Sequence, residues 1–258
     1  MPLELVGLYL KLPVFALVAA RLTGLLLFQP VLGSLAVPVQ VRALLIIGLA
    51  ALLTPVVPVP PNLPDSPTGV AAAALGELLL GILLGLAGML CFYGLQLGGL
   101  LLAQESGLAY GQILDPTTEE EDTLLGAFYL QLGLVLFLVL GGHRVLVSVC
   151  LDTFRMLPLL GATPATTHGA ELLVQGLALG SHLALRVAAP ALLALFLVNV
   201  ALGFISRTMP QLNVLAVGFS LKSLVTLLIM AAALPSGAEA FVDATAAIYD
   251  WLGNLIGR

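Results

Sequence analysis

The length, composition and charge of this chain exclude most soluble functions. It has 258 residues, of which 60% are hydrophobic and only 9% are charged, whereas soluble domains are about 45–50% apolar and about 25% charged. The formal net charge of −5 provides no basic surface for a nucleic-acid backbone. A soluble enzyme, a nucleic-acid-binding protein and a disordered chain are therefore excluded. Most of the surface must be covered by lipid or by other proteins.

Two apolar segments open the chain, over residues 12–32 and 43–59. Each is close to the length of about 20 residues that crosses a bilayer. The first lacks the basic region of a secretory signal, so we expect it to be a retained membrane segment. The second ends in a proline-rich stretch that continues to Pro67. Because proline interrupts both helices and central strands, this stretch is predicted to be a linker.

A long, glycine-rich apolar run follows over residues 70–103. As a straight helix it would extend about 50 Å, which is too long for one comfortable span. We therefore expect a kinked helix, or a tight hairpin broken near Gly94 or Gly98-Gly99. Gly81 and Gly85, like Gly94 and Gly98, are four residues apart, a spacing that predicts close packing of helix backbones.

The remaining chain alternates one polar stretch with further apolar runs. Residues 104–122 are the most polar and are predicted to form a loop, and apolar runs follow over 123–151, 172–205 and 212–234. No β pattern competes, so the predicted fold class is all-α: polytopic membrane-type helical hairpins with broken or kinked helices, in a single domain over 1–258.

The C-terminal segment, residues 236–258, differs in kind because its pattern is amphipathic. At 100° per residue, Glu239, Asp243 and Asp250 share one narrow sector, with Phe241 and Ile248 roughly opposite. A helix lying on anionic lipid would be basic, so we expect this acidic helix to contact protein.

Several polar side chains interrupt the apolar runs. They are Arg21, Glu77, Arg144, Arg186, Asn199 and Lys222. A central Arg or Lys costs about 2.5–3.5 kcal/mol on membrane-insertion scales, so these groups should face protein, water or a lumen. Asp152 and Arg155, three residues apart, are predicted to pair on one helical turn.

No catalytic or metal-binding motif is present in the sequence. It has no nucleophile elbow, no His-Glu-x-x-His, no phosphate-binding loop and no Cys/His cluster with ligand spacing. Cys91 and Cys150 are expected to be buried thiols. We predict no enzyme, no metal and no cofactor. An alternative is a self-contained proton-coupled secondary transporter using Glu77 or Glu105, although no internal repeat supports it.

One segment of the sequence indicates a particular protein family, which composition alone does not. Residues 199–214 read NVALGFISRTMPQLNV and are followed by Gly218-Phe219 and Lys222. The pattern closely resembles the signature of the FliR/SctT family of type III export-gate proteins, in its flagellar branch. Other stretches nearer the N-terminus also match the family pattern, in the same order. They are residues 21–24, 30–34, 37–38, 41–42, 77–81, 104–107, 115–116, 141–144 and 154–158. Ser220 stands where a proline is expected and Thr208 replaces a small apolar residue, but neither affects the assignment.

The resemblance implies a component of the flagellar protein export gate. Members assemble with FliP- and FliQ-type subunits, and with FlhB- and FlhA-type proteins, in the bacterial inner membrane at the flagellar basal body. Unfolded flagellar subunits pass through this channel. The injectisome version of the same gate is the alternative within the family.

The resemblance also implies roles for particular residues. Residues 104–122 correspond to a loop that helps to plug the closed channel, with Gln104, Gly107, Gly111, Asp115 and Pro116 as its candidate residues. The candidates for subunit packing or buried polar contacts are Arg21, Arg42, Glu77, Arg144, Asn199, Arg207, Pro210, Gln211, Asn213 and Lys222.

Overall fold

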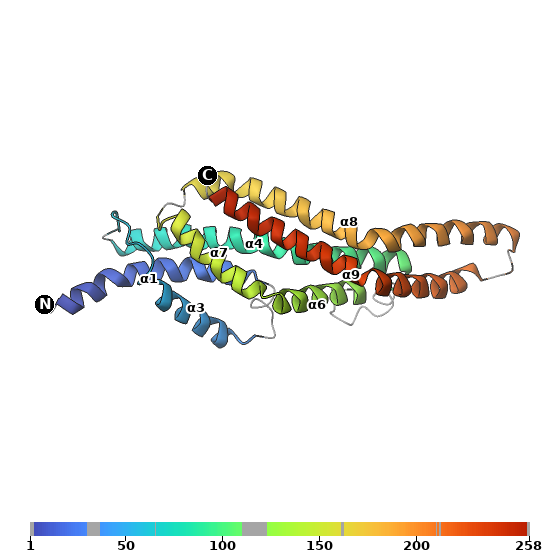
Figure 1. The fold of residues 1–258 in the computed structure, drawn as a ribbon, viewed down its shortest axis with the longest axis horizontal. Coiled ribbons are helices and arrows are strands. Elements are labelled where there is room, and N and C mark those ends of the chain that lie inside the picture. Colours follow the sequence, from blue (N-terminus) through green and yellow to red (C-terminus); the bar gives the residue numbers. More distant parts are fainter. Residues whose placement is uncertain are drawn as a thin grey trace. The chain divides into compact units, whose positions relative to one another are not determined.

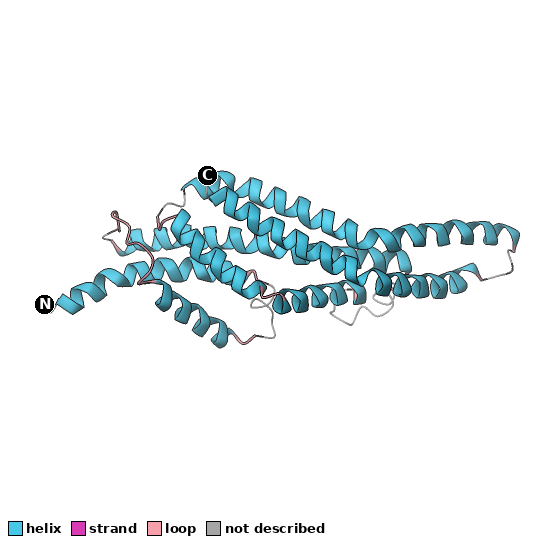
Figure 2. Ribbon diagram, in the orientation of Figure 1, coloured by secondary structure: helices cyan, strands magenta, loops and turns pink. Residues whose placement is uncertain are grey.

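The fold consists of long helices joined by short connections. The computed structural model describes residues 3–29, 37–64, 66–109, 123–160, 163–209, 211 and 213–256. These residues form seven helices and no strand (Figure 1, Figure 2). The predicted all-α class is confirmed.

The helices follow the apolar runs, with shifted ends. In chain order they are α1 Leu3–Leu27, α3 Val39–Leu53, α4 Pro67–Ser106, α6 Leu124–Val139, α7 Gly142–Met156, α8 Thr163–Thr208 and α9 Val214–Ile256. The proline-rich stretch separates α3 from α4, as predicted. Three helices in the described chain are long and apolar enough to cross a membrane, or four if α6 and α7 form one broken span. The chain is a multi-pass membrane protein.

Of the two alternatives expected for residues 70–103, the tight hairpin is wrong, because α4 is one continuous helix of 40 residues. Several of its glycines make room for neighbouring backbones instead of forming a turn. A Cβ added at Gly94 would lie 2.5 Å from the carbonyl oxygen of Gly180 in α8, and one added at Gly98 would lie 3.0 Å from that of Ala184. The close packing predicted from the four-residue glycine spacing is confirmed.

Other boundaries also differ from expectation. The run over 123–151 ends as α6 and restarts as α7, with Gly141 between them at φ 75°. The acidic C-terminal segment is not a separate helix, because α9 continues through Pro235. Within a membrane, neighbouring groups satisfy the backbone carbonyl that a proline leaves free, so an apolar and an amphipathic segment can share one helix.

The polar loop begins later than predicted. Gln104 lies in the last turn of α4, and Gly107 ends that helix at φ 84°. The amide of Ala109 donates to the carbonyl of Ala103 at 3.1 Å. The amide of Gly107 itself donates to the carbonyl of Gln104 at 3.3 Å, which is the inner hydrogen bond of the Schellman motif at helix ends.

The chain divides into two compact units, which are described separately. The first comprises the described parts of 1–90, 138–177 and 247–258. In it α1 packs against α3, and Leu17, Leu22 and Phe154 are fully buried.

The second unit comprises 91–137 and 178–246 and has an aromatic centre. The ring of Phe92 packs edge-on against Phe137 at 5.5 Å and against Phe241 at 5.3 Å between centroids. Phe241 of α9 is buried in this unit, and Glu239 and Asp243 are exposed; in the part of α9 that belongs to the first unit, Ile248 is buried and Asp250 is exposed.

Candidate functional site

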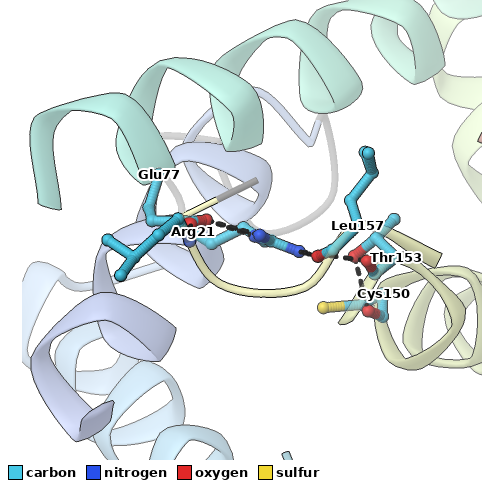
Figure 3. A network of polar contacts seen from close by, with 6 residues as sticks. Arg21, Glu77, Cys150, Thr153 and Leu157 are labelled. Carbon is cyan, nitrogen blue, oxygen red and sulfur yellow. Dashed lines mark hydrogen bonds and ion pairs between the residues drawn. The ribbon is translucent and has the colours of Figure 1, made fainter. Parts of the chain in front are cut away.

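A buried ion pair lies at the centre of the first unit. The Nε of Arg21 on α1 donates to Oε2 of Glu77 on α4 at 2.6 Å (Figure 3). The Nη2 atom lies 2.6 Å from the same oxygen as an ion-pair contact, although its angle falls outside hydrogen-bond geometry. Both side chains are almost completely buried, at 0% and 1% exposure.

The guanidinium of Arg21 also binds the C-terminal end of α7. Its Nη1 donates to the carbonyl of Thr153 at 3.1 Å and to that of Leu157 at 3.0 Å, as Figure 3 shows. The last carbonyls of a helix lack intrahelical donors and carry partial negative charge. The Arg21 Cζ atom also lies 4.5 Å from the ring centroid of Phe154. Arg21 therefore fixes the position of this helix end.

Glu77 continues the network into the turn after α7. Its Oε1 accepts a hydrogen bond from the amide of Leu160 at 3.0 Å. Leu160 has φ 69°, a left-handed conformation that an L-residue with a branched side chain seldom adopts. The carboxylate thus satisfies one cation and one amide, and the cluster of α1, α4 and α7 is electrically neutral.

Two glycines allow α1 and α4 to approach closely enough for this pair. A Cβ at Gly81 would overlap the carbonyl oxygen of Arg21, and a Cβ at Gly24 would overlap that of Leu78. Gly24 lies three residues from Arg21 on α1, and Gly81 lies four residues from Glu77 on α4. The close crossing of the two helices and the ion pair therefore occur at the same place. Buried charges are tolerated only where they are paired and hydrogen-bonded, and this crossing provides those partners.

Further ion pairs occur at the surface, one of them predicted from the sequence. Asp152 and Arg155 pair as predicted, at 3.5 Å, with both side chains exposed. In the second unit, Arg186 on α8 pairs with Asp243 on α9 at 3.1 Å and remains 51% exposed. Exposed pairs of this kind contribute little to stability.

The remaining predicted residues do not gather into one site. Arg42 donates to the carbonyl of Val37 at 3.0 Å. The residues that are exposed are Gln104, Arg144, Arg207, Gln211 and Asn213, while Asn199 and Lys222 are partly exposed and Gly107 is buried. Gly111, Asp115, Pro116 and Pro210 lie outside the described residues.

Sequence reasoning missed the groups that bind Arg21 and Glu77 from α7. Thr153 and Leu157 contribute backbone carbonyls, and Leu160 contributes an amide. Backbone partners leave no pattern in side-chain chemistry. The available signal was Pro158, which marks a helix end where carbonyls need donors.

No cluster of three His, Cys, Asp or Glu side chains with metal-binding geometry occurs among the described residues. Cys91 and Cys150 are buried free thiols, as predicted. The buried hydrogen bonds of Arg21 and Glu77 hold helices of the described chain in position.

Together, the long apolar helices, the buried neutral ion pair and the many exposed apolar side chains define a polytopic helical membrane protein with large uncovered surfaces. A family model described as bacterial export proteins, family 1, matches residues 12–248. The chain belongs to this family.

Individual relatives support the same assignment. The chain is 29% identical to the flagellar biosynthetic protein FliR of Escherichia coli over 92% of its own length and 90% of that protein. It is 30% identical to FliR of Pectobacterium carotovorum, over 83% and 82% of the two chains. The secretion system apparatus protein SsaT of Salmonella typhimurium is 26% identical, over 62% of each chain.

Proposed function

We propose that this protein is a component of the flagellar type III protein export gate. The observation that supports this most is the match of the export-protein family model to residues 12–248. Five of the flagellar FliR relatives align over 83–92% of the chain, whereas the secretion system apparatus protein SsaT aligns over 62% of it. This difference favours the flagellar gate over its injectisome counterpart. The proposed role is that of a structural component of the gate and not of an enzyme.

The proposed setting is the bacterial inner membrane at the flagellar basal body. There the chain would join FliP- and FliQ-type subunits, with FlhB- and FlhA-type proteins associated, to form the channel for unfolded flagellar subunits. The structure is consistent with assembly. In the most apolar 18-residue stretch of residues 216–248, only 11% is buried within the chain itself. Such a surface needs lipid or neighbouring subunits.

The polar residues have two proposed roles. Arg21 and Glu77 hold the chain's own helices together, since each is the other's buried partner. The exposed or partly exposed group, Arg144, Asn199, Arg207, Gln211, Asn213 and Lys222, is proposed to pack against other subunits, as are Arg42 and Pro210.

The proton-coupled transporter is less well supported. A coupling carboxylate must exchange protons with water on either side of the membrane. Glu77 is 1% exposed, and both of its oxygens are engaged, by Arg21 and by the Leu160 amide. Glu105 is exposed on the last turn of α4 and no described carboxylate or histidine pairs with it.

Copurification tests the proposed function. Coexpressed with FliP- and FliQ-type subunits of the same bacterium, a tagged chain should purify with both in one complex. If it remains a monodisperse monomer in detergent while the other two assemble fully without it, the proposed function is wrong.

The plug role of residues 104–122 needs its own experiment. Deleting residues 110–116 leaves the Gly107 helix end in place, so the complex should still form. We expect the deleted gate to conduct ions in a planar bilayer when the native gate does not. An assembled deletion variant with unchanged conductance would remove the plug assignment.

A further inference from the structure

The final part of α8 and the first part of α9 present an uncovered face in the second unit. These two segments lie side by side (Figure 1), and a Cβ at Gly218 would lie 3.1 Å from Leu202. Large apolar side chains on both helices point outward, with Phe204 69% and Leu228 62% exposed. We call the exposed surface of residues 193–209 and 213–228 the α8–α9 face.

The α8–α9 face carries positive charge without any negative charge. Arg207 is exposed and Lys222 is partly exposed. No Asp or Glu occurs between residues 187 and 238. Neither cation forms an ion pair with a described residue. In a chain of net charge −5, this segment is the exception.

Hydrocarbon alone does not suit such a face. The apolar side chains would be satisfied by lipid tails, but each cation there costs about 2.5–3.5 kcal/mol. An aqueous lumen does not suit it either, because Lys222 shares its side of α9 with the exposed side chain of Phe219, three residues away. A protein surface that is apolar and carries carboxylates satisfies both parts of the face.

The helix geometry indicates how closely such a partner can approach. Asn199, Gly203 and Arg207 recur every four residues along α8, so they share one side. A Cβ added at Gly203 would meet no atom within 4 Å. This glycine has no packing role within the described chain. Its bare backbone lies one turn from the Arg207 guanidinium, where a second helix can come close enough for its carboxylate to reach the cation.

We infer that the α8–α9 face binds an acidic transmembrane helix of another export-gate subunit, with carboxylates opposite Lys222 and Arg207 and a close backbone crossing at Gly203. This inference rests on the proposed function and adds the chemistry of the partner. Charge complementarity of this kind fixes register and rejects wrong partners.

Charge reversal tests the electrostatic part. Lys222→Glu should lower the yield of the copurified complex about tenfold or more, because juxtaposed like charges cost several kcal/mol. Lys222→Arg should retain the yield, and replacing the partner's carboxylate with lysine should restore the Lys222→Glu complex. The matched control is Arg155→Glu on α7, an exposed cation outside the face, which should assemble normally.

The Gly203→Leu variant tests the geometric part independently. Since nothing in the described chain occupies that space, the variant should purify as a folded chain and still fail to join the complex. Gly203→Ala should have a smaller effect. This pair decides the question if Lys222→Glu fails to fold.

The outcomes separate the inference from the proposed function. If the native chain itself does not copurify with the gate subunits, the proposed function fails. If the native chain assembles and Lys222→Glu and Gly203→Leu assemble equally well, only the inference is overturned. It is also overturned if the variants assemble normally but change gate conductance, or change only binding to phosphatidylglycerol vesicles.

Discussion

At the scale of single residues, Arg21 and Glu77 differ from every other charged residue in the described chain by their burial. Two isolated charges would each carry a large desolvation penalty, and their attraction offsets it only where the remaining polar atoms also have partners. Here the two oxygens of Glu77 and the Nη1 of Arg21 bind α1, α4 and the end of α7 in one network. The pair is a structural lock that depends on both members.

Removing one member should therefore be severe. Glu77→Ala leaves the guanidinium buried and unpaired, which typically costs about 3–5 kcal/mol. We expect a correspondingly large loss in the free energy of unfolding, measured by denaturant titration of the detergent-solubilised protein. Asp152→Ala, which removes an exposed carboxylate from a surface pair, should change it by about 0–1 kcal/mol. If both variants lowered the free energy of unfolding equally, the buried pair would contribute no more to stability than the surface pair.

Removing both members should be far milder than removing one. Well-packed apolar replacements of a buried ion pair are often neutral or stabilising. The double variant Arg21→Met/Glu77→Met should thus be more stable than Glu77→Ala, although the carbonyls of Thr153 and Leu157 lose the Arg21 guanidinium as a donor. A double-mutant cycle with Arg21→Met and Glu77→Met measures the coupling. A coupling energy near zero would contradict the conclusion that Arg21 and Glu77 stabilise the helices as a pair.

At the scale of elements, the glycines of α4 have distinct environments. Gly81 faces the backbone of α1, Gly94 faces that of α8, and a Cβ at Gly76 would meet nothing within 4 Å. Glycine lowers helix stability by about 1 kcal/mol relative to alanine. The close approaches that it permits compensate for this loss at the first two positions only.

Gly81→Ala and Gly76→Ala form a matched pair on one helix. The first introduces a methyl group that overlaps the carbonyl oxygen of Arg21, so α1 must shift and the ion pair is disturbed. It should lower the thermal midpoint of unfolding. The second should leave that midpoint unchanged or raise it, since alanine favours the helix by up to about 1 kcal/mol. The reverse order would show that α1 and α4 do not cross here.

The same helix shows how far sequence reasoning reaches. Its existence, its polar interruption at Glu77 and the packing role of its glycines were predictable, because they depend on composition and spacing. Its continuity was not, since a glycine that forms a turn and a glycine that admits a neighbouring helix have the same local sequence. That distinction depends on α6 and α8, which are remote along the chain.

The polar site shows a similar limit. A charged residue in an apolar run is predicted to face protein, water or a lumen, and Arg21 faces protein, where it pairs with Glu77. The identity of the partner depends on which helices cross, and two of its other acceptors are backbone carbonyls. Only the three-residue spacing of Asp152 and Arg155 allowed a pair to be predicted directly.

At the scale of the whole molecule, a large apolar surface is left exposed that contacts within the single chain do not cover. α4 is well covered in its most apolar window, with 56% buried, whereas the corresponding windows of residues 169–208 and 216–248 are 22% and 11% buried. A soluble protein would not tolerate this. A chain whose helices differ so much in coverage is suited to an assembly in which α8 and α9 receive other subunits.

Cysteine labelling can map which surface the assembly covers. The two native thiols are 2% and 3% exposed, so the background reaction with a membrane-permeant maleimide should be low. Phe204→Cys and Leu228→Cys, at positions 69% and 62% exposed, should react in the isolated chain. In the copurified complex with FliP- and FliQ-type subunits, both should be protected.

The control position for this labelling is Arg155→Cys on α7, where the native side chain is 74% exposed and lies outside the α8–α9 face. Its reaction should be the same in the isolated chain and in the complex. Protection of Phe204→Cys and Leu228→Cys alone would assign the uncovered helices to subunit contact. If instead they react equally in both states, lipid covers this face, and the low internal burial of α8 and α9 reflects membrane exposure.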